Sequence, residues 1–301
     1  MVVHYVLCPS LRFVIEERKS SSAPAARGAS VVPLKIDQYA AAIITGGSSG
    51  IGAAFIELFA RLNGRAWLGN LSRSEPPLLR SQPRLRHFPC DLRDRESIPG
   101  VVQQISQSIA NDADKGPILL VNNSGFGAYG PFPEPELQRH LQMLEVNISA
   151  PVHLVGEFLQ LLDERGGSIV NVASTAAFQP CPYLATYGAT KAFLMNWSLA
   201  LSHDLAPRGI QVLCVCPGPT KTNFFRAAGF ETPPPQGGSG MTSEIVARQS
   251  LQALERGRRL VVNGWSNRFL AFASSKLPRT WAAAAAKQAI AQWRQQRDAD
   301  S

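Results

Sequence analysis

From residue 40 onward, short apolar runs alternate with longer segments in which apolar residues recur every three or four positions. The short runs predict six buried strands, at 40–45, 66–71, 85–90, 117–125, 167–174 and 210–218. The longer segments predict helices, at 51–63, 95–111, 137–166 and 187–206. Most of these strands are apolar on both faces, which is typical of a parallel sheet covered by helices on its two sides. The fold class that this pattern predicts is α/β.

Polar residues stand where the predicted strands end. They are Thr45–Gly52, Ser72–Arg73, Asp91, Asn122–Gly125, Ser174 and Pro217–Thr222. In open parallel sheets, ligands bind beyond the carboxyl ends of the strands. The sequence therefore predicts one ligand site along this edge.

A glycine-rich stretch, TGGSSGIG at 45–52, joins the first strand to the first helix. Glycine permits the tight turn and lets the backbone approach a pyrophosphate, while the helix N-terminus offers free N–H groups and a favourable dipole. The spacing differs from the common G-x-G-x-x-G, so we expect a variant of the dinucleotide-binding turn.

The stretch LSRSE after the second strand bears on the choice of dinucleotide. An acidic residue there would accept hydrogen bonds from a ribose 2′-hydroxyl, but Ser72 stands in its place and Arg73 follows. Because a guanidinium suits a 2′-phosphate, we expect NADP(H) to be preferred over NAD(H). The alternative is that Arg73 is an ordinary surface arginine.

Three residues near the fifth strand carry the candidate chemistry. Tyr187 and Lys191 are four apart in a predicted helix and so share one face. A nearby ammonium favours the phenolate and so lowers the tyrosine pKa from its usual value of about 10. Ser174 ends the fifth strand, where its hydroxyl could polarise a carbonyl while Tyr187 exchanges the proton. Tyr183 is the competing phenol, but it precedes the helix and has no lysine four residues later.

At these residues the chain resembles the short-chain dehydrogenase/reductase family, most closely its NADP-linked bacterial oxidoreductases. The matching motifs are TGGSSGIG, CDLRD with Asp91, NNSG, EVNISAPVHL with Asn147, YGATK and PGPTKT, together with the 13-residue separation of Ser174 from Tyr187. The resemblance covers about 38–265. It implies a single Rossmann-type domain with a doubly wound parallel sheet of about seven strands.

The resemblance also implies roles for residues of the site. Tyr187 would be the acid/base, and Lys191 would hold the nicotinamide ribose and lower the tyrosine pKa. Ser174 would orient the substrate oxygen, and Asn147 would hold a water in a proton relay. Without the resemblance, Asn147 reads as a helix asparagine bonded to its neighbours. Asp91 would contact adenine, Asn123 would line the cleft, and Thr222 would hold the carboxamide. The implied cofactor-binding set is Gly46, Ser48, Ser49, Gly50, Ile51, Gly52, Arg73, Asp91, Leu92, Asn123, Gly125, Tyr187, Lys191, Pro217, Gly218 and Thr222.

Three positions depart from the commonest form of the family's motifs. Gly47 and Ser124 stand where alanine is frequent, and Thr190 stands where serine is frequent. Each change replaces one small residue by another, so we expect the chemistry to be retained.

Length and composition fit one large domain: 301 residues, 45% hydrophobic, with a net charge of +8. We expect an N-terminal extension at 1–37, because its serine- and alanine-rich part reads as a linker, and a domain at 38–301. The sequence contains no run of 18 apolar residues and no signal-peptide pattern. Its five cysteines have no metal-binding spacing, so no metal is expected. Unpaired cysteines of this kind fit a reducing cytoplasm, which is the expected location. No nucleic-acid recognition motif is present.

Basic residues cluster in two places. Residues 61–86 hold six Arg against one Glu, where a cofactor phosphate could sit, and 256–279 hold five Arg and one Lys against no acid. The second cluster is interleaved with Trp265, Phe269 and Phe272, so it is either a solvated basic face or a surface for weak contact with anionic membranes. The alanine-rich stretch 281–293 predicts a helix within a basic tail at about 265–301.

The segment after PGPTKT bears on the substrate. We expect a lid at about 222–241, where three phenylalanines with flanking Gly and Pro suit a flexible, partly apolar cover. The hypothesis is an apolar ketone, aldehyde or secondary alcohol of medium size; the alternative is that these phenylalanines pack on the body. Two other functions stay open: a catalytically quiet NADP-binding sensor or scaffold, and a peripheral membrane protein. The resemblance also implies a homodimer or homotetramer paired through helices that include 137–163 and 187–206.

Overall fold

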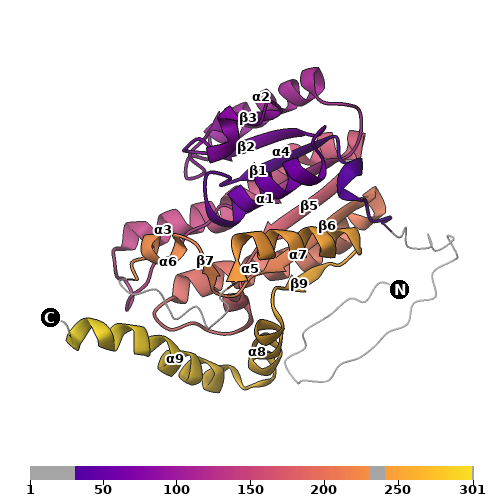
Figure 1. The fold of residues 1–301 in the computed structure, drawn as a ribbon. Helices are drawn as coiled ribbons and strands as arrows, with labels where there is room; N and C mark the ends of the chain where they lie inside the picture. Colours follow the sequence, from indigo (N-terminus) through magenta and orange to yellow (C-terminus); the bar gives the residue numbers. More distant parts are fainter. Residues whose placement is uncertain (1–30, 231–240, 300–301) are drawn as a thin grey trace, which may run out of the picture.

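A computed structural model describes residues 31–230 and 241–299 of the chain, with side chains to residue 291. Its centre is a seven-stranded sheet in the order β3-β2-β1-β4-β5-β6-β9, with all neighbours parallel (Figure 1). The order runs outward in both directions from β1 and β4, as in a doubly wound Rossmann-type sheet. The predicted fold class is confirmed. The strands are β1 (Ala41–Thr45), β2 (Trp67–Ser72), β3 (Leu85–Pro89), β4 (Ile118–Asn122), β5 (Gly167–Val172), β6 (Ile210–Cys216) and β9 (Leu260–Val262).

Helices cover both faces of this sheet. The helices α1 (Gly50–Leu62) and α7 (Ser243–Glu255) pack on one face, and α2 (Ser97–Asp112), α4 (Ala150–Arg165) and α5 (Ala185–Asp204) pack on the other. Successive side chains of β1 divide between the two cores: Ala42 and Ile44 belong to the first, Ala41 and Ile43 to the second. Burial on both faces is why the central strands have no polar side.

The long helix predicted at 137–166 is interrupted. The chain forms α3 (Leu137–Leu144), then a turn of π-helix at Glu145–Ser149, and then α4. The π-helical turn contains Asn147, whose side chain bonds outside its own helix. Single π-helical turns often mark functional sites, and here the extra residue per turn re-aims one side chain inward.

Shorter elements complete the described chain. A second, two-stranded parallel sheet joins β7 (Thr220–Lys221) to β8 (Met241–Thr242), and α6 (Phe224–Ala227) follows β7. Single turns of 3₁₀-helix lie at Ile36–Gln38, Pro77–Arg80, Thr175–Phe178 and Ala206–Arg208. Within the predicted N-terminal extension, Ile36 is buried and Leu34 packs against the first core, while residues 1–30 lie outside the described part.

Two helices follow β9 and lie beneath the body of the domain in Figure 1. They are α8 (Trp265–Lys276) and α9 (Arg279–Ala299), here together called the C-terminal arm, and α9 contains the helix predicted at 281–293. Arg279 attaches the arm to the body through a hydrogen bond from its Nη1 to the carbonyl of Phe178, at 3.1 Å. Among the helices of 31–230 and 241–299, none is both long and apolar enough to traverse a bilayer.

Candidate active site

A cavity of about 790 Å³ lies at the carboxyl ends of the strands. It is lined by the glycine turn after β1, by residues that follow β2, β4, β5 and β6, and by both helices of the C-terminal arm. All the predicted catalytic and cofactor-binding residues line this cavity except Gly52 and Asn147. Strand ends far apart in the sequence thus meet at one edge, as parallel topology requires.

The glycine turn has the backbone that a bound phosphate group needs. Gly46 and Gly50 have φ values of +67° and +57°, in the left-handed region that favours glycine. A Cβ at Gly52 would lie 2.2 Å from the carbonyl oxygen of Gly46, so the first turn of α1 presses directly on the turn before it. Because Gly46 and Gly50 line the cavity at the N-terminus of α1 and carry no side chain, this turn fits a dinucleotide pyrophosphate.

Two asparagine side chains support this turn, Asn70 fully buried and Asn123 partly buried. Asn70 Oδ1 accepts a hydrogen bond from the N–H of Gly47 at 2.9 Å, and its Nδ2 donates to Ser72 Oγ at 2.9 Å. Asn123 donates from Nδ2 to the carbonyl of Thr45 and from its own N–H to Thr45 Oγ1, both at 2.9 Å. Thr45 belongs to the polar strand ends that the sequence indicates, whereas Asn70 was not predicted. The signal of Asn70 was a polar residue inside an otherwise apolar strand.

The end of the cavity beside β2 is rich in arginine. Arg73 is exposed and lines the cavity, as do Asp91 and Arg93. Arg93 Nε lies 2.9 Å from each oxygen of the Asp91 carboxylate, and this pairing holds the pKa of Asp91 below its usual value, with a smaller contribution from Arg73. An unshielded guanidinium at the end of β2 fits a 2′-phosphate.

Tyr187 lies on the first turn of α5 and is only 8% exposed. The side chain of Ser174, just beyond β5, hydrogen-bonds with it, and the ring of Phe224 packs at 5.1 Å between centroids. Burial raises the pKa of Tyr187 to about 12, because a phenolate loses hydration there, while the Ser174 hydrogen bond opposes this shift.

Lys191 is 4% exposed and lies one turn further along α5. Its Nζ donates to the carbonyl of Val172 at 2.9 Å and stands 5.8 Å from the centroid of the Tyr187 ring. Burial lowers the pKa of Lys191 to about 8. The helical spacing does bring the two side chains together, but a lowered tyrosine pKa is not found in the chain by itself, because desolvation penalises both charged forms.

Asn147 is fully buried and its amide is paired with two segments. Its Oδ1 accepts from the N–H of Phe126 at 3.1 Å, and its Nδ2 donates to the carbonyl of Phe126 and to Thr190 Oγ1, each at 3.0 Å. Thr190 Oγ1 in turn donates to the carbonyl of Tyr187 at 2.7 Å. Asn147 therefore connects the loop after β4 to the turn of α5 that carries the tyrosine and the lysine. These partners are distant in sequence, unlike the helix neighbours that the residue alone suggested.

Aromatic side chains of α6 also line the cavity, close to Tyr187. Phe224 and Phe225 of α6 line it, whereas Phe230 stacks on Tyr129 with ring centroids 4.0 Å apart. Phe224 and Phe225 thus match the predicted apolar cover of the site, whereas Phe230 matches the alternative of packing on the body. Residues 231–240 of the expected lid lie outside the described part. The arm contributes residues that no sequence signal pointed to, namely Asn267, Leu270, Ala271, Ser274, Ala286, Ala289 and Ile290.

Comparisons with known proteins agree with this geometry. Residues 40–231 match the family described as short chain dehydrogenase. Among curated proteins, the chain is 30% identical over 198 residues to the probable oxidoreductase EphD of Mycobacterium tuberculosis, covering 63% of this chain but 32% of EphD. It is 30% identical over 192 residues to the NADPH-dependent 3-dehydrocapnine reductase of Ornithobacterium rhinotracheale, covering 62% of this chain and 68% of the reductase.

A solved structure is similar over most of the domain. The short chain dehydrogenase from Burkholderia cenocepacia in complex with NADP superposes with a TM-score of 0.67 at 25% identity, covering 81% of this chain and 95% of that one. The family match spans well over half of the chain and contains the glycine turn, the serine, the tyrosine and the lysine. The chain therefore belongs to the short-chain dehydrogenase family of oxidoreductases.

Proposed function

We propose that this protein transfers a hydride between NADP(H) and a carbonyl or secondary alcohol substrate. The observation that carries the proposal is the meeting of Ser174, Tyr187 and Lys191 in the cavity that also contains the glycine turn. One end of this cavity suits an anionic dinucleotide, and the other suits a proton donor beside an apolar substrate.

The bound dinucleotide would supply the hydride, and the residues of the chain would manage the substrate oxygen and its proton. Ser174 orients that oxygen by hydrogen bonding. Tyr187, with its pKa raised to about 12, keeps its proton at neutral pH and is ready to donate it to a carbonyl oxygen that gains negative charge. This protonation state is the one that reduction of a carbonyl requires.

Lys191 would stabilise the tyrosine as it gives up its proton. With a pKa lowered to about 8, most of the lysine is charged at pH 7, and it stands 5.8 Å from the phenol ring. An ammonium at this range offsets the charge of a phenolate inside a poorly hydrated site. Asn147 would hold the backbone of this turn in place through Phe126 and Thr190, and would hold a water in the proton relay.

NADP(H) is the proposed cofactor. Arg73 lines the cavity beyond β2, and Ser72 stands where an acidic residue would accept hydrogen bonds from a ribose 2′-hydroxyl. Two of the named proteins support this choice: the reductase from O. rhinotracheale is NADPH-dependent, and the structure from B. cenocepacia is a complex with NADP. For the substrate we propose an apolar ketone or aldehyde of medium size, because Phe224, Phe225 and Ile290 line the site near Tyr187.

The test is a screen of carbonyl compounds with NADPH and NADH side by side, following the oxidation of the reduced cofactor. We expect turnover with NADPH, and a loss of about 10²- to 10⁴-fold in kcat for Tyr187→Phe with little change in NADPH binding. Tyr183→Phe is the matched control and should retain activity, because Tyr183 packs against Tyr129.

Two outcomes would count against the proposal. If Tyr187→Phe and the parent chain reduce the same ketones at similar rates, another group donates the proton. If the parent chain binds NADPH tightly but turns over nothing in a broad panel, the sensor or scaffold alternative is correct.

A further inference from the structure

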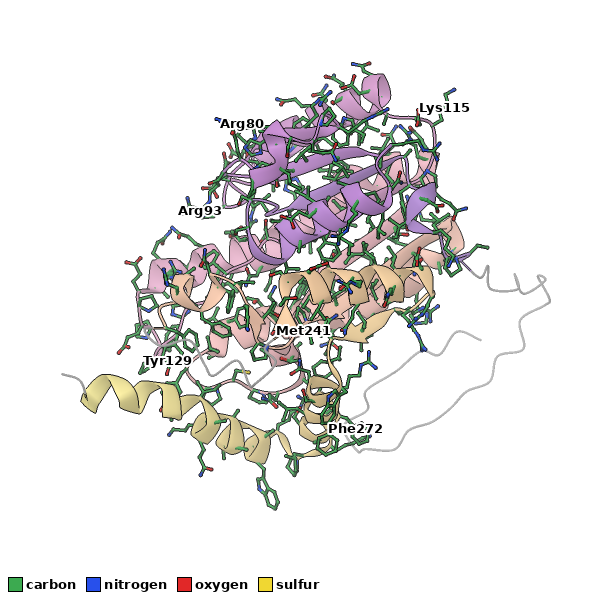
Figure 2. The ribbon with its side chains drawn as sticks, viewed as in Figure 1. Arg80, Arg93, Lys115, Tyr129, Met241 and Phe272 are labelled. Atoms are coloured by element: carbon green, nitrogen blue, oxygen red, sulfur yellow. The ribbon has the colours of Figure 1, made fainter. Side chains whose placement is uncertain are left out.

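The outer face of α8 exposes three large aromatic side chains. Trp265, Phe269 and Phe272 are 84%, 70% and 64% exposed and recur at the spacing of one helix face. Figure 2 shows Phe272 on α8, below the body of the domain. Single exposed apolar residues are common on proteins, but a row of three aromatics on one helix indicates a surface that binds something.

The opposite face of α8 belongs to the active site. Asn267, Ala271 and Ser274 line the cavity, and at about 100° per residue they lie roughly half a turn around the helix from the exposed aromatics. The next helix repeats the arrangement: Ala282 and Ala286 are buried, while Trp281 is 69% exposed. The arm is thus a wall between the active site and whatever covers its outer face.

The charge of this region is strongly positive. Residues 256–291 contain five arginines and two lysines and no acidic residue, and the rest of the chain has 23 basic against 22 acidic residues. Almost all of the net charge of +8 therefore lies in the stretch that holds the arm. On the arm, Arg268, Lys276 and Lys287 are exposed, and Lys276 Nζ lies 5.6 Å from the centroid of the Phe272 ring.

We propose that the C-terminal arm docks on the surface of an anionic phospholipid bilayer. Trp265, Phe269 and Phe272 would enter the boundary between headgroups and acyl chains, and Arg268, Lys276 and Lys287 would lie at the level of the lipid phosphates. A second copy of the chain is the rival occupant. A symmetric contact through the arm would set its positive charges against those of the partner, which is unfavourable, whereas an anionic surface neutralises them.

Docking also identifies a class of substrate, and this step rests on the proposed function. Since the arm lines the cavity with one face and would contact the bilayer with the other, the cavity lies next to the membrane. The substrate class that fits is an apolar ketone or aldehyde dissolved in the bilayer.

The docking is tested by flotation of the full chain with vesicles of phosphatidylcholine, with and without phosphatidylglycerol. We expect flotation with the anionic vesicles at about 0.1 M salt and a clear loss at about 1 M, where charges are screened within a few ångströms. The triple variant W265S/F269S/F272S should reduce the partition coefficient at least about tenfold. R268Q/K276Q/K287Q should abolish the preference for anionic vesicles.

Matched variants separate this surface from general apolarity and charge. L62S/L137S removes exposed leucines of α1 and α3, and R65Q/R80Q/K115Q removes three exposed cations elsewhere; both should float like the parent chain. The proposal fails if the parent chain stays at the bottom of the gradient, or floats equally with neutral vesicles. It also fails if W265S/F269S/F272S changes the oligomeric mass in solution and leaves flotation unchanged, because a second copy then covers the face.

The substrate step has its own readout. W265S/F269S/F272S should lower turnover of a long-chain ketone presented in anionic vesicles and leave turnover of a short, water-soluble ketone unchanged. Equal effects on the two ketones would refute it. Flotation requires no catalysis, so an inactive protein that floats would refute the proposed function and leave the docking intact.

Discussion

Replacing Lys191 by methionine should make the protein more stable at neutral pH while inactivating it. Lys191 is 4% exposed, and burial lowers its pKa from 10.5 to about 8. At about 1.4 kcal/mol for each pKa unit, keeping the ammonium inside the fold costs roughly 3 kcal/mol at pH 7. Methionine has a similar unbranched shape without the charge, so it removes this cost.

The hydrogen bond of Lys191 to Val172 is lost at the same time. That bond, 2.9 Å long, contributes about 1 kcal/mol, so the net gain for Lys191→Met at pH 7 is about 2 kcal/mol. For a domain of this size the gain corresponds to a rise of about 5 °C in Tm. Turnover should fall at least about 100-fold, because the tyrosine loses the ammonium beside it.

The pH dependence distinguishes this reasoning from a simple packing effect. Between about pH 8 and 10.5 the native lysine is neutral while the unfolded one is still charged, so the unfolded chain binds more protons and the stability of the parent protein rises with pH. Above that window the cost has disappeared, and Lys191→Met should be the less stable protein by about 1 kcal/mol. The difference between the two proteins therefore changes sign.

The assay is urea unfolding of both proteins at pH 7 and at about pH 10.5, with differences taken at each pH so that other titrating groups cancel. Lys115→Met, an exposed lysine labelled in Figure 2, is the control and should show no such change of sign. A Lys191→Met protein less stable than the parent at pH 7, or a difference that is the same at both pH values, would refute the reasoning.

Three further predictions concern the cofactor turn, the cofactor choice and the apolar wall. Gly52→Ala places a Cβ 2.2 Å from the Gly46 carbonyl oxygen, so it should cost about 1–3 kcal/mol of stability and weaken NADPH binding. Gly100→Ala is the control: open space surrounds this helix glycine, and the substitution should stabilise the protein by about 0.5–1 kcal/mol. Equal effects of the two substitutions in thermal unfolding would contradict this prediction. Arg73→Ser should raise the KM for NADPH about 10- to 100-fold and leave that for NADH unchanged in steady-state kinetics, and an equal rise for both would remove its role at a 2′-phosphate. Arg139 donates hydrogen bonds to the carbonyls of Gly127 and Ala227, and Ala227 ends α6. Arg139→Met should therefore loosen α6 and raise the KM for apolar ketones about tenfold at nearly constant kcat. An unchanged KM would show that these hydrogen bonds do not position α6 for substrate binding.

Much of the architecture is encoded in short stretches of sequence. The apolar runs of β1, β4, β5 and β6 and the helices between them follow from local periodicity, because a strand buried on both faces has little choice of residue. The candidate site follows from the same logic, since the ends of parallel strands must meet at one edge and residues four apart in a helix must share a face.

Other features depend on which distant segments meet. β9 is three residues long, too short for a periodic signal, and it becomes a strand by pairing with β6. The break in the helix at 145–149 accompanies the bonding of Asn147 to Phe126 and Thr190, and no local pattern marks those partners. The role of Asn70 depends on the fold, which brings its side chain to the glycine turn to accept a hydrogen bond from Gly47.

The spacing of Tyr187 and Lys191 was readable from the sequence, but the direction in which their pKa values move was not. Spacing determines which side chains are neighbours, whereas a pKa depends on how much water the rest of the chain removes. Burial raises the pKa of the phenol, which stays protonated, and lowers the pKa of the lysine, which loses its charge more easily. The sequence by itself determined which groups can react. The tertiary structure decided their protonation and which segments enclose them, because desolvation sums contacts from segments far apart in the chain. The C-terminal arm, held to the body by the hydrogen bond of Arg279 to Phe178, is one such segment, about a hundred residues away in sequence.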